Sequence, residues 1–225
     1  MKKIVKLILG VPKILYYNFR IFDFKTALHF PLIVAHKAVI YNPKRGSIKI
    51  SGNPSFGMLT VGLWDGSDHL GMGQYTTIEF NDSSTISIDG HVSIASGSHL
   101  YIGKSAKLQI GSGFKGNYGL HIVCRKHITI GTDVLISWNC SIMDSDGHEI
   151  INKENELVNK NEEIIIGDHV WIGSTVTILK GTSIANGSII GSNCTVHKKC
   201  LENNSIYVSS ETVRRLPREE MNWIL

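Results

Sequence analysis

Residues 166–201 read IGDHVW IGSTVT ILKGTS IANGSI IGSNCT VHKKCL, and this stretch decides the fold. An aliphatic residue recurs every six positions without a slip, at Ile166, Ile172, Ile178, Ile184, Ile190 and Val196. A period of six fits neither an α-helix nor an ordinary strand, and it is typical of a β-solenoid. Strands of a sandwich would place apolar residues at every second position, between loops of varied length. The sequence therefore predicts a coil in which three hexads form one turn of a triangular prism.

The fifth position of each hexad is also predicted to face the interior, since it holds only Val, Thr, Ser and Cys. Cys140, Cys194 and Cys200 fall at this position, which indicates core residues, and the absence of a CxxC pair or secretion signal favours a reducing cytoplasm.

Gly and Asn accept positive φ at low cost, so they are expected at the corners. These corner candidates are Gly167, Gly173, Asn186, Gly187, Gly191 and Asn193.

The same spacing continues upstream with slips and insertions, as in Ile88, Ile94 and Leu100. Repeat arrays tolerate insertions because these emerge as loops while neighbouring coils still stack. The sequence predicts an all-β chain with the coil over residues 78–208, interrupted by a loop over 143–163. Residues 1–77 are predicted to form a cap or leader with irregular strands, and residues 209–225 a helical tail.

The composition is that of a protein able to bury a sizeable core, with 225 residues, 22 Gly and 19% charged residues. A formal charge of +4 is mild, and no basic stripe with interleaved aromatic residues is present, which argues against a nucleic-acid partner.

The first 22 residues, MKKIVKLILGVPKILYYNFRIF, mix basic with large apolar residues. Lys6 interrupts the apolar run and no small-residue cleavage site follows, so a signal peptide is not indicated. The apolar run is too short to cross a bilayer. Two interpretations remain, which can coexist: a cap over the open end of the prism, which we favour, or a basic segment on an anionic membrane surface.

The largest interruption of the repeat, MDSDGHEIINKENELVNKNEE over residues 143–163, is the predicted site of chemistry. Loops that project from a rigid repeat scaffold are where such proteins place function. His148 lies near its start, and an imidazole can accept and return a proton near neutral pH. Asp144 and Asp146 precede it, and Asp146 is a candidate to orient the imidazole.

At this point the sequence resembles the hexapeptide-repeat acyltransferases, and among them the galactoside and maltose O-acetyltransferase-like enzymes. Two segments carry the resemblance, NYGLHIVCRKHITIGTDVLISWNCSIMDSDGHEI over 117–150 and EIIIGDHVWIGSTVTILKGTSIANGSIIGSNCTVHK over 163–198. The resemblance implies a left-handed parallel β-helix and a homotrimer that binds acetyl-CoA between adjacent subunits. It also implies that His148 is the general base of a direct transfer to a glycan or small-molecule acceptor.

Further site residues are implied by the same resemblance. Trp171 and Ser174 match coenzyme-binding positions, and Lys198 matches a basic residue near the coenzyme phosphates. Asn117 lies where the family binds the acceptor, although the usual Asn position holds Gly119; a corner Asn is the alternative.

The leading hypothesis is an acetyl-CoA-dependent O-acetyltransferase acting on a saccharide hydroxyl of a glycan, capsule or lipopolysaccharide precursor, in the cytoplasm or at the inner face of the membrane. An N-acyltransferase acting on an amino sugar is one alternative. Another is a metal hydratase resembling the γ carbonic anhydrases, for which the candidate ligands are His121, His127, His148 and His169. No His pair shows the spacing of that site, so no metal is expected.

Overall fold

The computed structural model describes residues 2–64, 73–198, 202–208 and 213–215. Two helices, α1 (Lys2–Ile21) and α2 (Phe24–Ala27), precede a coil whose strands form three sheets. Sheet A contains β1 (Leu32–Val34), β4 (Leu59–Val61), β7 (Val92–Ile94), β10 (Phe114–Gly116), β13 (Leu135–Ile136), β16 (Trp171–Ile172), β19 (Ile189–Ile190), β21 (Ser205–Tyr207) and β22 (Val213–Arg215). Sheet B contains β2 (Ala38–Tyr41), β5 (Thr76–Phe80), β8 (His99–Ile102), β11 (His121–Cys124), β14 (Ser141–Met143), β17 (Thr177–Leu179) and β20 (Thr195–Val196). Sheet C contains β3 (Ile48–Ser51), β6 (Thr85–Asp89), β9 (Lys107–Ile110), β12 (His127–Ile130), β15 (Ile164–Ile166) and β18 (Ser183–Ile184).

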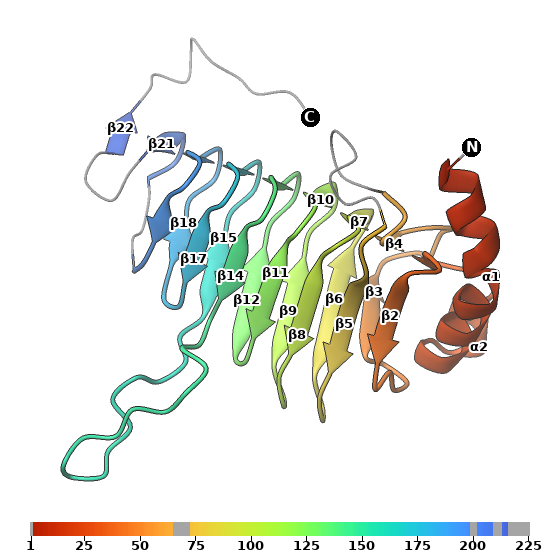
Figure 1. The fold of residues 1–225 in the computed structure, drawn as a ribbon, viewed down its shortest axis with the longest axis horizontal. Coiled ribbons are helices and arrows are strands. Elements are labelled where there is room, and N and C mark those ends of the chain that lie inside the picture. The colour runs from red at the N-terminus through yellow and green to blue at the C-terminus, as the bar shows by residue number, and fades with distance from the viewer. Residues whose placement is uncertain (1, 65–72, 199–201, 209–212, 216–225) are drawn as a thin grey trace.

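From β1 to β20 the chain visits sheets A, B and C in turn, and these strands pair in parallel with the strand one turn earlier or later (Figure 1). The register is regular: Ile142 pairs with Ile178, and Ile178 with Val196, along sheet B. The predicted fold class, a left-handed parallel β-helix shaped as a triangular prism, is confirmed in its three sides and in the parallel order of its strands. The three sheets define three edges, which we name A–B, B–C and C–A after the sheets that they join.

Positions one and five of the hexads fill the interior, as predicted. Ile166 to Val196 at position one are at most 1% exposed, and among the described residues of position five even Thr182 and Ser188 are buried. Cys140 and Cys194 are buried free thiols, whereas Cys200 lies outside the described residues. Burial raises the pKa of the Cys140 thiol to about 11, so it acts as a small core residue and not as a nucleophile.

The corner prediction is confirmed for positive φ at Gly187 and Asn193, but not for glycine at the second position of the hexad. Positive φ falls at the fourth position of the hexad, for example at Thr175 (56°), Gly187 (68°) and Asn193 (60°). Glycine at the second position is required by close approach instead. A Cβ at Gly173 would lie 2.7 Å from the Ser192 nitrogen in the coil above, so a larger residue would separate the stacked corners.

One predicted boundary is wrong, and part of the predicted tail has another structure. The coil begins at Leu32, not near residue 78, because β1 already pairs with β4 and β2 with β5. The sequence hides these turns because insertions break the hexads between residues 32 and 77. In the tail predicted to be helical, Val213–Arg215 form β22, which pairs antiparallel with β21, and the rest of residues 209–225 lies outside the described residues.

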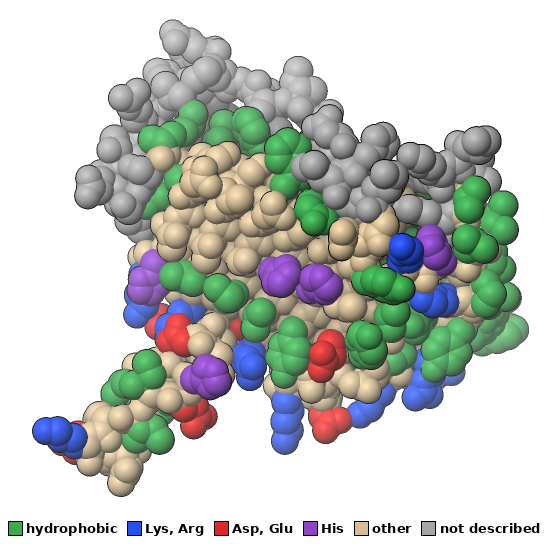
Figure 2. All heavy atoms as spheres, viewed as in Figure 1, with side chains coloured by type: hydrophobic (Ala, Val, Ile, Leu, Met, Phe, Trp, Pro, Cys, Tyr) green, Lys and Arg blue, Asp and Glu red, His purple; other side chains and the backbone are tan. Residues whose placement is uncertain are grey.

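The two helices lie at the N-terminal end of the prism (Figure 1), where α1 packs against β1. The buried Asn18 accepts from the Leu32 N–H and donates to the Leu32 carbonyl, so its amide completes the hydrogen bonds of the first strand. The 145–163 loop projects from the opposite half of the prism and carries charged side chains (Figure 2). Within the described part of the chain, neither helix combines the length and hydropathy required to cross a bilayer.

Candidate functional site

The 145–163 loop leaves the prism between β14 and β15, at the B–C edge (Figure 1). Its two arms run antiparallel. Ile151 bridges to Leu157, and the Val158 N–H donates to the Ile150 carbonyl at 2.9 Å. The loop is therefore an ordered arm whose base is fixed on the rigid coil.

Asp144 anchors the start of this loop. Its buried carboxylate accepts three backbone hydrogen bonds, from Arg125 (2.6 Å), Lys126 (2.8 Å) and His127 (2.9 Å). The Glu162 N–H donates to the Asp144 carbonyl, so the same residue also binds the end of the loop. These bonds replace water for a buried carboxylate and tie both ends of the loop to the β11–β12 corner.

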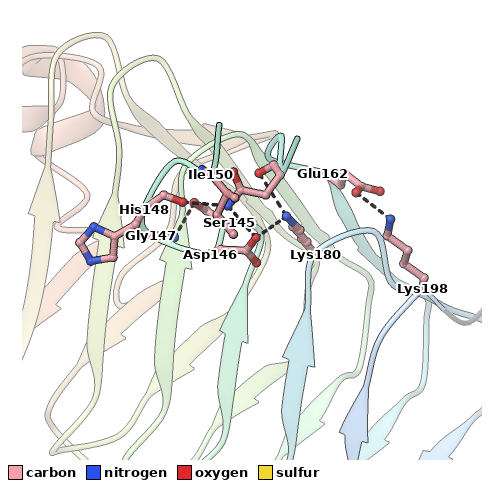
Figure 3. A network of polar contacts seen from close by, with 9 residues as sticks. Ser145, Asp146, Gly147, His148, Ile150, Glu162, Lys180 and Lys198 are labelled. Carbon is pink, nitrogen blue, oxygen red and sulfur yellow. Dashed lines mark hydrogen bonds and ion pairs between the residues drawn. The ribbon is translucent and has the colours of Figure 1, made fainter. Parts of the chain in front are cut away.

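A second group of polar contacts holds the segment that contains His148 (Figure 3). The buried Lys180 ammonium, which follows β17, pairs with the Asp146 carboxylate at 2.5 Å and donates to the Asn159 carbonyl at 3.1 Å. The side chain of Asn159 donates to Asp146 (3.0 Å) and to the His148 carbonyl (2.8 Å), and it accepts from the Ile150 N–H (2.7 Å). The Lys180 and Asn159 hydrogen bonds lower the pKa of Asp146, which is ionised at neutral pH.

This arrangement corrects the predicted role of Asp146. Its carboxylate binds Lys180 and Asn159, and the imidazole of His148 is exposed and points away from that pair (Figure 3). The structure thus does not bring together the two residues that the sequence analysis paired. Asp146 instead fixes the backbone of the segment, because its acidic charge is neutralised by a buried cation on the neighbouring coil. Lys180 and Asn159 were not predicted, and neither shows a repeat or motif signal that could have identified it.

Trp171 and Ser174 lie near the A–B edge. Trp171 is 37% exposed on sheet A, and its indole N–H donates to the Ser137 hydroxyl at 3.2 Å. Pairing in register aligns it with other outward apolar residues, a ladder of Leu135, Trp171, Ile189 and Ile206. This ladder was not predicted, although the sixth positions of hexads 18 residues apart, such as Trp171 and Ile189, carry the signal. A partly exposed apolar ladder is a surface suited to an apolar ligand arm or a neighbouring subunit.

Asn117, the predicted acceptor-binding residue, is largely buried at a corner of the prism. It lies at the corner between β10 and β11, is 5% exposed, and its amide oxygen accepts from the N–H of Tyr118 at 2.9 Å. Its backbone N–H donates to the Ile136 carbonyl of the next coil. The corner role, given above as the alternative, accounts for these contacts.

Lys198 lies at the B–C edge after β20 and pairs with Glu162 of the loop at 3.1 Å. Both side chains are about half exposed, so the pair is weak and its cation is open to exchange with another anion. Lys198 therefore keeps the chemistry predicted for a phosphate contact, with Glu162 as a competing partner.

The predicted site residues thus lie at two different edges of one subunit. His148 and Lys198 are at the B–C edge, whereas Ser174 and Asn117 are at the A–B edge. The full width of sheet B separates these edges, because each strand of that sheet runs from one to the other. A site built from both groups requires the B–C edge of one chain and the A–B edge of another.

The histidines named for a metal site do not converge. His121 stacks edge-on against His99 on the outer face of sheet B, with ring centroids 5.1 Å apart, whereas His127 begins β12 on sheet C. Among the described residues no group of three metal-ligating side chains was found.

The last coils of the prism are similar to hexapeptide-repeat proteins. The family model for bacterial transferase hexapeptides (six repeats) matches residues 163–198. A polysialic acid O-acetyltransferase of Neisseria meningitidis is 42% identical over 67 residues, 29% of this chain and 31% of that protein. A putative lipopolysaccharide biosynthesis O-acetyl transferase of Escherichia coli strain K12 is 30% identical over 115 residues, 46% of this chain and 58% of that protein. The solved structure of the polySia specific acetyltransferase NeuO is 24% identical, with a TM-score of 0.49, over 86% of this chain and 84% of that chain.

The chain spans less than two thirds of the length of these curated relatives. The resemblance to the hexapeptide-repeat acyltransferases predicted from the sequence is confirmed, by the family model in the last coils and by relatives that are named O-acetyltransferases.

Proposed function

We propose that this protein transfers an acetyl group from acetyl-CoA to a saccharide hydroxyl. The observation that carries the proposal is the placement of His148: an exposed imidazole on a segment that is fixed by Asn159 and Lys180, at one edge of a coil of transferase hexapeptides. The relatives named as O-acetyltransferases of polysialic acid and of lipopolysaccharide biosynthesis support a glycan, capsule or lipopolysaccharide precursor as acceptor.

In this proposal His148 is a general base. Its neutral imidazole takes the proton of the acceptor hydroxyl while that oxygen attacks the carbonyl carbon of the thioester. The carbon–sulfur bond then breaks, and the imidazolium returns the proton to the departing thiolate. The products are an acetyl ester and the free thiol of coenzyme A, and no acyl-enzyme is required.

The donor would bind along the A–B edge of a neighbouring subunit, in a homotrimer. Trp171 and the apolar ladder offer contacts for the pantetheine arm, and Ser174 lies at the adjoining corner. Lys198 would contact a phosphate by exchanging its weak partner Glu162. The buried free thiols Cys124, Cys140 and Cys194 are in keeping with a cytoplasmic location.

The experiment is a coenzyme-release assay with acetyl-CoA against a panel of glycans and amino sugars. We expect His148→Ala to reduce turnover about 10²–10⁴-fold with an unchanged melting temperature. The matched control is His91→Ala, which removes another exposed imidazole at the C–A edge. A native rate of acetyl transfer by His148→Ala would refute the proposal, and transfer to amines alone would replace O-acetylation by N-acylation.

A further inference from the structure

Helix α1 has a second apolar face that the described structure leaves largely exposed, with only Phe19 packed against the rings of Phe24 and Phe30. Its outward large hydrophobic side chains are 37% to 62% exposed: Ile8, Leu9, Val11, Leu15, Tyr16 and Phe19. At 100° per residue these positions occupy one continuous arc of about 160°. A surface helix of a globular protein normally carries polar residues on the face opposite its core, so this arc is not explained by packing onto the prism.

The buried face of the same helix is fixed on the first coil. Ile14, Tyr17 and Ile21 are buried, and the Tyr17 hydroxyl accepts from the Ile40 N–H at 3.0 Å. The Lys13 ammonium donates to the carbonyls of His36 (2.6 Å) and Ala38 (2.9 Å). The outward arc is therefore held in place by contacts on the opposite side, and it cannot turn inward without breaking them.

Positive charge is concentrated on this segment. Residues 1–28 hold six of the 23 basic residues of the chain but only one of its 19 acidic residues, Asp23. The rest of the chain is close to neutral. Lys13 and Arg20 border the apolar arc, and Phe24 and Leu28 extend the exposed apolar surface beyond α1. Figure 2 shows hydrophobic side chains gathered at this end of the molecule with Lys and Arg beside them.

We propose that this face, formed by the outward side chains of α1 with Phe24 and Leu28, binds the interface of an anionic lipid bilayer. An apolar arc bordered by cations matches acyl chains beneath anionic headgroups, and it is the pattern of a helix that lies in the membrane plane. A second copy of this chain is disfavoured as the occupant, because pairing two such faces would bring together two segments of high positive charge. The inference does not depend on acetyl transfer, and it would place the prism beside a membrane-bound acceptor.

The test is sedimentation of the full chain with vesicles of phosphatidylcholine alone or with phosphatidylglycerol added, without acetyl-CoA or acceptor. We expect binding to the anionic vesicles only, weakened by high salt. The double variant Ile8→Asp with Leu15→Asp is expected to bind at least tenfold more weakly. The matched control, Val158→Asp with Ile165→Asp, removes two exposed apolar residues and adds the same charge elsewhere, and it should bind as the native chain does.

Thermal unfolding of each variant shows whether it folds. Equal vesicle binding by the α1 variant and the native chain would overturn the proposal, as would absence of binding by the native chain. If the α1 variant changes the number of chains per particle in sedimentation without vesicles, the face is an interface between copies, and the membrane proposal fails. None of these results bears on the coenzyme-release assay, so failure here is distinguishable from failure of the proposed transferase.

Discussion

Mixed trimers of two inactive variants are predicted to regain about one third of the native activity. One variant is His148→Ala, which removes the proposed base at the B–C edge, and the other is Ser174→Trp, which fills the corner at the A–B edge. We assume that each site combines the B–C edge of one chain with the A–B edge of the next. A mixed trimer then contains a site to which neither substituted residue contributes, because one chain supplies an intact B–C edge and its neighbour an intact A–B edge.

The magnitude follows from the cyclic order of three chains. A site is intact only where a Ser174→Trp chain supplies His148 and a His148→Ala chain supplies Ser174. A mixed trimer contains two chains of one variant and one chain of the other. Whichever variant is present twice, going round the ring one contact between neighbouring chains has this order. Every mixed trimer therefore carries one intact site of three, whatever the ratio of the variants.

The assay uses co-expression of the two variants with different tags, tandem purification of the mixed particles, and coenzyme release per trimer. Native mass spectrometry checks that each particle has three chains. Each variant alone should be nearly inactive, and two differently tagged native chains give the reference rate. Mixed trimers no more active than the separate variants would refute the shared site and show that each chain builds its own.

Two further predictions concern the loop and the pH dependence of stability. Asn159→Ala loses two hydrogen bonds to the backbone of His148 and Ile150, each worth about 0.5 kcal/mol at an exposed site, so kcat should fall roughly fivefold. The matched control is Asn152→Ala, which loses two hydrogen bonds from backbone N–H groups at the loop tip and should keep native kcat. An equal fall of kcat in both variants would contradict a positioning role for Asn159. Burial, and then the charge of His121, lower the pKa of His99 in the folded state. The unfolded chain therefore takes up this proton first as the pH falls below about 6.5, and the free energy of unfolding decreases. His99→Gln should flatten the profile of chemical denaturation midpoints between pH 7 and 5, and an unchanged profile would contradict this assignment.

The repeat was predictable because every hexad has the same short pattern of inward and outward residues. Ile166 to Val196 face a common interior, so an unbroken spacing of six leaves one way to bury them all. The first turns of the coil were missed, since insertions break that spacing although strands such as β1 and β4 still pair. The outward ladder through Trp171 and Ile189 was overlooked for another reason: it depends on which hexads share a face, which only the closure of three sides determines.

The contacts around His148 could not be predicted, because they join residues that have no fixed spacing. Asp146 was expected beside the imidazole on sequence proximity, yet Lys180 lies one coil away in space and 34 residues away in sequence, and it pairs with that carboxylate. A buried cation without a partner is costly, so the nearest carboxylate of the loop is drawn to Lys180, and the imidazole is left free. The same pair keeps the Asp146 carboxylate from orienting the His148 imidazole. A base that is positioned through its backbone and completed by a second chain would be assembled only in the oligomer, where we propose that the donor also binds.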